Sequence, residues 1–133
     1  MSDIRAQSTS EAFDLLYEAV DHIPGFVVEP DRKHFEVRAS SDATKFVLTF
    51  MPGNRRVLIS HGVEVFPGFR GKGLGTSMCE MREQVARLAG VTLLLATVRD
   101  ENLAEVRVLE KCGWKRLTQN EENKCSLWGK QLL

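Results

Sequence analysis

Cysteines are few in this sequence, and none is placed to hold zinc or to carry out redox chemistry. Cys79, Cys112 and Cys125 are odd in number, and no two of them form a Cys-x-x-Cys pair. Isolated cysteines of this kind are typical of buried, reduced thiols. We therefore expect three free thiols and no metal site.

The sequence also lacks an excess of either charge and any long apolar run. Its 18 Lys and Arg residues balance 18 Asp and Glu residues, which argues against a broad electrostatic surface for nucleic acid or for an anionic membrane. The N-terminus is polar, and no stretch reads as a signal peptide or a membrane span. We expect a soluble, cytoplasmic protein that is a monomer or a homodimer.

Repeats, low-complexity tracts and linkers are absent as well. A chain of 133 residues with 43% hydrophobic residues fits one domain over residues 1–133 with its own core. Periodicity predicts an α/β fold. The predicted elements are a short strand at 3–6, a helix from 8 to 23, strands over 33–39, 44–50 and 55–65, a helix over 74–89, a strand over 91–98, a helix over 102–111, and strands over 114–119 and 125–132.

Two of these elements carry the clearest patterns. Met78, Met81, Val85 and Leu88 step by three and four, which predicts one buried stripe on an amphipathic helix. The run "VTLLLATV" at 91–98 is apolar throughout, which is typical of a strand buried on both faces.

A glycine-rich segment, "FPGFRGKGLGTSM" at 66–78, joins a predicted strand to that helix. Its spacing does not match the P-loop pattern, because Gly73 is not followed by Lys and Ser or Thr. It also fails the dinucleotide pattern, since Thr76 stands where the third glycine belongs. What remains is Arg70-x-x-Gly73-x-Gly75, whose backbone N–H groups and helix N-terminus suit a pyrophosphate. On spacing alone, a turn without a ligand is the alternative.

Two motifs together resemble a known family. The segment "VEVFPGFRGKGLGTSMCEMREQVARLAG" at 63–90 resembles motif A of the GNAT superfamily of acyl-CoA-dependent N-acetyltransferases. Downstream, "NLAEVRVLEKCGW" at 102–114 is similar to the second signature of the same family. The resemblance implies a mixed central sheet of six to seven strands flanked by helices, with a splay between strands 4 and 5.

The resemblance also implies which residues hold acetyl-CoA. The backbone N–H of Val63 meets the thioester carbonyl, and Val65 bonds the pantetheine arm. Asn102 has two roles open to it, as the cap of a helix and as a hydrogen-bond partner of the cofactor arm. The pyrophosphate site comprises Arg70, Gly71, Lys72, Gly73, Leu74, Gly75 and Thr76.

His61 is the candidate general base. It precedes Val63 by two residues, so we expect both on one face of a strand, about 6.6 Å apart. That separation suits a base that acts through one water, and imidazole titrates near neutrality. The alternative is a packed or surface histidine. Glu64 should point to the other face and is the weaker candidate.

The leaving-group acid is missing from the pattern. Many relatives have a tyrosine seven residues after the motif's Asn, but this sequence has Leu109 there, and its one tyrosine is Tyr17. Glu105 is expected to be a solvated helix residue. The acceptor site of relatives includes the loop between the last two strands, "QNEEN" at 119–123 here, which is either solvated or attracts a cationic amine.

We predict from these residues an N-acetyltransferase that moves an acetyl group from acetyl-CoA to a primary amine by direct attack in a ternary complex. The amine belongs to a small molecule or a protein. The alternative is a GNAT-like module that binds an acyl-CoA or a protein partner without turnover, which the missing tyrosine favours.

Overall fold

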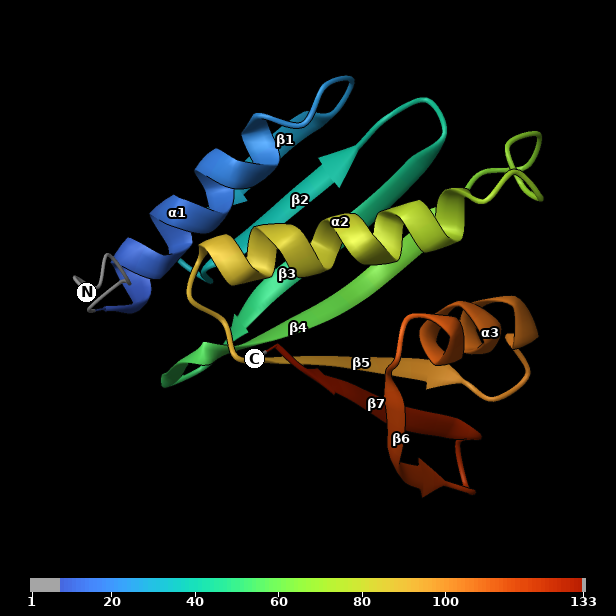
Figure 1. The fold of residues 1–133 in the computed structure, drawn as a ribbon. Coiled ribbons are helices and arrows are strands. Elements are labelled where there is room, and N and C mark those ends of the chain that lie inside the picture. Colours follow the sequence, from blue (N-terminus) through green and yellow to red (C-terminus); the bar gives the residue numbers. More distant parts are fainter. Residues whose placement is uncertain (1–7, 133) are drawn as a thin grey trace.

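The computed structural model describes residues 8–132, in which three helices lie against one seven-stranded sheet (Figure 1). The strand predicted at 3–6 lies outside the described residues. The elements in chain order are α1 (Thr9–Asp21), β1 (Val27–Asp31), β2 (Glu36–Ser40), β3 (Thr44–Met51), β4 (Asn54–Val65), α2 (Leu74–Leu88), β5 (Leu93–Arg99), α3 (Leu103–Lys111), β6 (Lys115–Asn120) and β7 (Cys125–Gln131).

Helices α1 and α2 pack side by side on one face of strands β1–β4, and α3 packs against α2 near the end of β5 (Figure 1). Ser8 caps α1 by accepting a hydrogen bond from the Glu11 N–H at 3.1 Å. Both tryptophans, Trp114 and Trp128, are buried in the core that the helices and the sheet enclose. No helix within residues 8–132 combines the length and the apolarity that crossing a membrane requires.

The buried stripe of α2 differs from the predicted one. Met78 and Val85 are buried and Met81 is half-buried, but Leu88 is 68% exposed. Arg82 takes a place in the stripe and is only 1% exposed. The prediction was wrong at Leu88 because the helix turns a charged residue, rather than a fourth apolar one, towards the sheet.

The sheet has the strand order β1-β2-β3-β4-β5-β7-β6, with β4 and β5 parallel and all other neighbours antiparallel. Strand β1 was not predicted, and the strand predicted over 33–39 lies at Glu36–Ser40 because residues 32–35 form the turn between β1 and β2. An edge strand that contains Pro30 and buries no residue fully gives no alternating pattern. The mixed sheet predicted by the resemblance is confirmed.

Strands β4 and β5 separate after a short pairing. Their partners are Val57–Ile59 on β4 and Leu93–Leu95 on β5, and the strands have no paired residues beyond these. Because of this splay, Thr97 and Arg99 on one face of β5 are exposed. The prediction of a strand buried on both faces is therefore wrong for the second half of β5, and the predicted splay is confirmed.

A β-bulge interrupts β4 at the splay. The register of β3 with β4 shifts between Lys45, paired with Glu64, and Val47, paired with His61. Gly62 lies in this shift with φ +64°, and a Cβ atom there would come within 3.3 Å of the Val47 side chain. Glycine is therefore required both by the backbone conformation and by the close contact.

Candidate functional site

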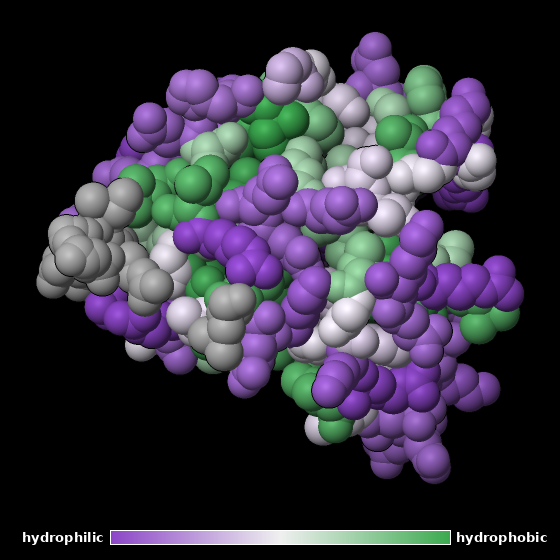
Figure 2. All heavy atoms as spheres, viewed as in Figure 1, coloured by the Kyte–Doolittle hydropathy of each residue, from purple (hydrophilic) through white to green (hydrophobic). Residues whose placement is uncertain are grey.

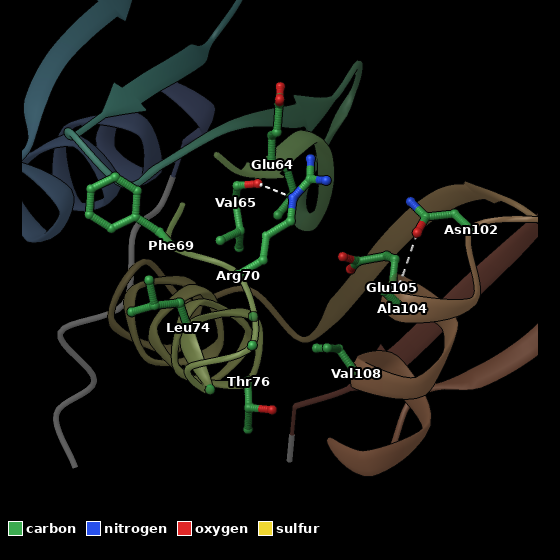
Figure 3. A pocket seen from close by; sticks show the side chains of 14 residues that line it. Glu64, Val65, Phe69, Arg70, Leu74, Thr76, Asn102, Ala104, Glu105 and Val108 are labelled. Atoms are coloured by element: carbon green, nitrogen blue, oxygen red, sulfur yellow. Dashed lines mark hydrogen bonds between the residues drawn. The ribbon is translucent and has the colours of Figure 1, made fainter. Parts of the chain in front are cut away.

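A cavity of about 410 Å³ lies between the end of β4, the start of α2 and the start of α3 (Figure 3). In the space-filling view it is the indentation between the glycine-rich loop and α3 (Figure 2). Its lining residues are Val63, Glu64, Val65, Phe69, Arg70, Gly71, Gly73, Leu74, Gly75, Thr76, Asn102, Ala104, Glu105 and Val108. The structure thus gathers every predicted cofactor residue except Lys72 around one space.

The glycine-rich turn shapes one wall of this cavity. Gly71 and Gly73 have φ values of +78° and +79°, and nothing lies within 4 Å of a Cβ atom built on either. Gly73 is the N-cap of α2, and no side chain caps the helix there. The first N–H groups of α2 therefore have no side-chain acceptor and adjoin the cavity, which suits an anion.

Gly75 has a different role, because it brings two helices together. A Cβ atom at Gly75 would lie 3.1 Å from the Val108 side chain on α3. The missing side chain thus allows α3 to pack closely against the first turn of α2. This contact holds the two walls of the cavity in place.

Arg70 provides the positive charge of the cavity. Its Nε donates to the Val65 carbonyl oxygen at 2.9 Å, so the guanidinium is held against the end of β4 (Figure 3). Lys72 does not line the cavity, and its ammonium lies 5.9 Å from the centre of the Phe69 ring.

A second cavity of about 440 Å³ opens between the separated parts of β4 and β5. It is lined by Ser60, His61, Gly62, Val63, Arg82, Ala96, Thr97, Val98, Arg99, Asn102 and Glu105. Val63, Asn102 and Glu105 line both cavities. The two spaces therefore meet at the splay, and a molecule in one can contact a molecule in the other.

His61 and Val63 lie on opposite faces of the sheet, which corrects the prediction. Val63 packs against the core on the helix side. His61 and Glu64 pair with Val47 and Lys45, which share the other face of β3. The bulge at Gly62 reverses the alternation that the prediction assumed. His61 therefore shares a face with Glu64 and not with Val63.

Glu105 is not the solvated residue that the sequence predicted. Its side chain is 20% exposed and one carboxylate oxygen lies 4.0 Å from Nη2 of Arg82. Burial raises the pKa of Glu105, and the charge of Arg82 opposes that rise. The carboxylate points into the first cavity (Figure 3). A carboxyl group with a raised pKa at the junction of two cavities is suited to proton transfer.

Arg82 is the residue that sequence reasoning missed. It lines the second cavity, donates through Nη1 to Ser60 Oγ and through Nε to the Met78 carbonyl oxygen, and its Nη2 has no hydrogen-bond acceptor among the described protein atoms. The one signal in the sequence is a basic residue four positions after Met78 on an apolar stripe.

Asn102 performs the capping role that the sequence left open. Its side-chain oxygen accepts a hydrogen bond from the Glu105 N–H at 3.2 Å (Figure 3). Its side-chain amide nitrogen forms no hydrogen bond within residues 8–132, and the residue lines both cavities. Leu109, at the position of the family's tyrosine, is fully buried. Tyr17 stacks on Phe13 within α1 and is absent from both cavities.

The sequence matches the Acetyltransferase (GNAT) family over residues 46–114, which is just over half of the chain. No curated protein matches the chain significantly in sequence.

Two solved structures resemble this one along almost its whole length, and a third resembles it along about three quarters. The protein yncA from Salmonella typhimurium, solved with its cofactor acetyl-CoA, superposes with a TM-score of 0.61 at 16% identity, over 97% of this chain and 92% of that one. An acetyltransferase of GNAT family from Streptococcus pneumoniae superposes with a TM-score of 0.62 at 16% identity, over 97% of this chain and 98% of that one. The IAA acetyltransferase from Bacillus cereus superposes with a TM-score of 0.63 at 12% identity, over 76% of this chain and 82% of that one. At these identities the likeness establishes the fold.

Proposed function

Since the chain belongs to the GNAT family of acetyltransferases, we propose that it transfers an acetyl group from acetyl-CoA to a primary amine of a small molecule or a protein, by direct attack in a ternary complex. The observation that carries this proposal is the junction of two cavities at Val63, Asn102 and Glu105. The first cavity suits the acyl donor and the second suits the amine. Attack across the junction needs no covalent enzyme intermediate.

The first cavity fits the phosphates of coenzyme A. Gly71 and Gly73 keep the turn free of side chains, and the uncapped start of α2 offers N–H donors together with the positive end of its dipole. We assign the pyrophosphate to the backbone N–H groups from Leu74 to Thr76 and to the Arg70 guanidinium. Lys72 adds positive charge at the same turn.

Val63 and its neighbours hold the reacting end. Acetyl-CoA supplies an acetyl thioester, whose carbonyl oxygen gains negative charge during transfer. The Val63 N–H lies beyond the last pair of β4 with β5, and we assign it the role of hydrogen-bond donor to that oxygen. Val65 and Asn102 bind the arm of the cofactor on either side of the cavity.

The proton steps belong to two side chains in the second cavity. His61 takes the proton of the acceptor amine, directly or through one water. Leu109 has no proton to give, so we assign the leaving-group proton to Glu105, which lines both cavities. Its burial keeps more of the acid protonated near neutral pH than an exposed glutamate would be.

An acceptor screen tests the proposed function. Release of free thiol from acetyl-CoA is measured with a panel of amines, amino acids and peptides, next to a calorimetric titration with acetyl-CoA. Binding together with thiol release on at least one amine supports the transferase. Binding without release on any acceptor supports the alternative of an acyl-CoA-binding module, which the buried Leu109 favours. Absence of acyl-CoA binding overturns both.

Arg70→Ala is expected to weaken acetyl-CoA binding about tenfold, because it removes one exposed charge-assisted contact from the first cavity. Titration calorimetry measures the change. Arg87→Ala is the matched control, since Arg87 is an exposed arginine at the other end of α2. Equal affinities of the two variants would contradict the role of Arg70.

His61→Ala is expected to lower kcat at pH 7 about tenfold to a hundredfold, near the lower end of the general-base range because the site is open to water. Acetyl-CoA affinity should stay near that of the wild type, since His61 does not line the first cavity. The pH–rate profile of the variant should lose one limb. A profile unchanged from the wild type would exclude His61 from the mechanism.

A further inference from the structure

Four side chains on the open face of the sheet, the face opposite α1 and α2, form a chain of hydrogen bonds that ends at His61. Arg38 Nε donates to Glu36 Oε2 at 2.7 Å, and Thr49 Oγ1 donates to Glu36 Oε1 at 3.0 Å. Thr49 Oγ1 is also 2.7 Å from His61 Nε2. These hydrogen bonds thus connect β2 through β3 to β4.

The register of the strands brings these groups together. Glu36 pairs directly with Thr49 on the neighbouring strand. Thr49 pairs with Ile59, which places His61 diagonally across from it on the same face. The bulge at Gly62 begins only after His61, so the histidine keeps the alternation of the first part of β4.

The chemistry of the groups fixes the direction of each bond. The Arg38 hydrogen bond lowers the pKa of Glu36 from its ordinary value, and the Thr49 hydrogen bond acts in the same direction, so this side chain, 12% exposed, is a carboxylate that only accepts. A threonine hydroxyl has one proton, and Thr49 gives it to Glu36. His61 Nε2 must then be the donor to Thr49. In the neutral imidazole, Nδ1 is left without a proton.

We propose that Glu36 and Thr49 are positioning residues that hold neutral His61 in the Nε2–H tautomer, and that Nδ1 is the atom that takes the proton of the acceptor amine. This inference rests on the proposed function. It explains how a histidine on an exposed strand face can accept one proton at a defined atom. The chain of hydrogen bonds fixes both the orientation of the ring and which nitrogen is unprotonated. His61 is the catalytic residue, and Glu36 and Thr49 act through it.

Other charged groups around His61 lie on five other elements, β2, β3, α2, β5 and α3, and on its own strand. On the open face these are Arg38, Lys45 and Glu64, of which Lys45 and Glu64 form an ion pair at 3.5 Å. In the second cavity they are Arg82, Arg99 and Glu105. None of these groups forms a hydrogen bond with His61, so the contact with Thr49, which Glu36 orients, distinguishes its two nitrogens.

The first arm of the test is nitrogen NMR of the histidine side chains in the ligand-free protein at a pH where His61 is neutral. His61→Gln identifies the resonances. The wild type should show a protonated Nε2 and an unprotonated Nδ1. Thr49→Val, which cannot accept the Nε2 proton, should give a mixture of tautomers, and Thr49→Ser should restore the wild-type pattern. A wild-type His61 with a proton on Nδ1, or an equal mixture, overturns the inference.

The second arm is kinetic. Thr49→Val and Glu36→Gln should each lower kcat about tenfold, with little change in KM for acetyl-CoA. This loss of kcat is smaller than the loss that a wrong histidine tautomer causes in a buried Ser-His-Asp triad. Thr49→Ser should recover the rate. Thr49→Val added to His61→Ala should not lower kcat further, since Glu36 and Thr49 act through the imidazole. Thr118→Val, on the exposed strand β6, is the matched control and should leave the rate unchanged.

The two arms separate this inference from the proposed function. A screen in which no amine is acetylated overturns the proposed function, whereas the tautomer is read without any substrate. Normal turnover in Thr49→Val would overturn the positioning role and leave the transferase intact.

Discussion

Arg82→Ala should lower the free energy of unfolding by about 3–5 kcal/mol, because it removes one partner of a buried ion pair and leaves a cavity. The guanidinium is 1% exposed and bonds to β4 through Ser60 Oγ. It also lies 4.0 Å from Glu105 on α3. Without it, the buried hydroxyl of Ser60 loses its partner and the Glu105 carboxyl loses its compensating charge.

Urea unfolding at pH 7 measures this change, and two further variants separate its causes. Arg87→Ala, an exposed arginine on the same helix, should stay within about 0.5 kcal/mol of the wild type. The double variant Arg82→Met and Glu105→Met should be more stable than Arg82→Ala, because it replaces the pair by apolar side chains and leaves no uncompensated charge. If Arg82→Ala unfolds like Arg87→Ala, the buried pair does not hold α2, α3 and β4 together.

The sequence predicted the parts of the fold that repeat a local pattern. Phe13, Leu16 and Val20 recur at helical spacing within the helix predicted from 8 to 23, and all three are buried on α1. The glycine-rich turn was recognisable because Gly71 and Gly73 need backbone conformations that other residues adopt at a cost. Such signals lie within a few residues of one another and need no knowledge of the rest of the chain.

The features that were missed depend on contacts between distant segments. The bulge at Gly62 is defined by the pairing of β4 with β3, so the sequence alone could not show that His61 and Val63 face opposite sides. Glu105 is four-fifths buried because α3 packs against α2 through Gly75. Arg82 is buried because Ser60 and Glu105 meet it from two other elements. A helical pattern read alone assigns both charges to solvent.

Glu105→Gln is expected to lower kcat about a hundredfold to a thousandfold, within the range of a lost general acid. Its amide keeps the size of the side chain and an oxygen that faces Arg82, but has no acidic proton for the departing thiolate. In the wild type, loss of that proton leaves a carboxylate beside the Arg82 guanidinium, which stabilises it. Acetyl-CoA affinity, measured by calorimetry, should change little. One limb of the wild-type pH–rate profile should disappear.

The choice of acceptor amine distinguishes Glu105 from His61. An amine of low pKa is already neutral at the assay pH, so it relieves the need for a base but not for a leaving-group acid. The defect of His61→Ala should therefore shrink with such an amine, and the defect of Glu105→Gln should persist. Glu110→Gln, an exposed glutamate on the same helix, is the control and should match the wild type. Recovery of Glu105→Gln with the low-pKa amine would instead make Glu105 part of the base, and the thiolate would then leave without a protein acid.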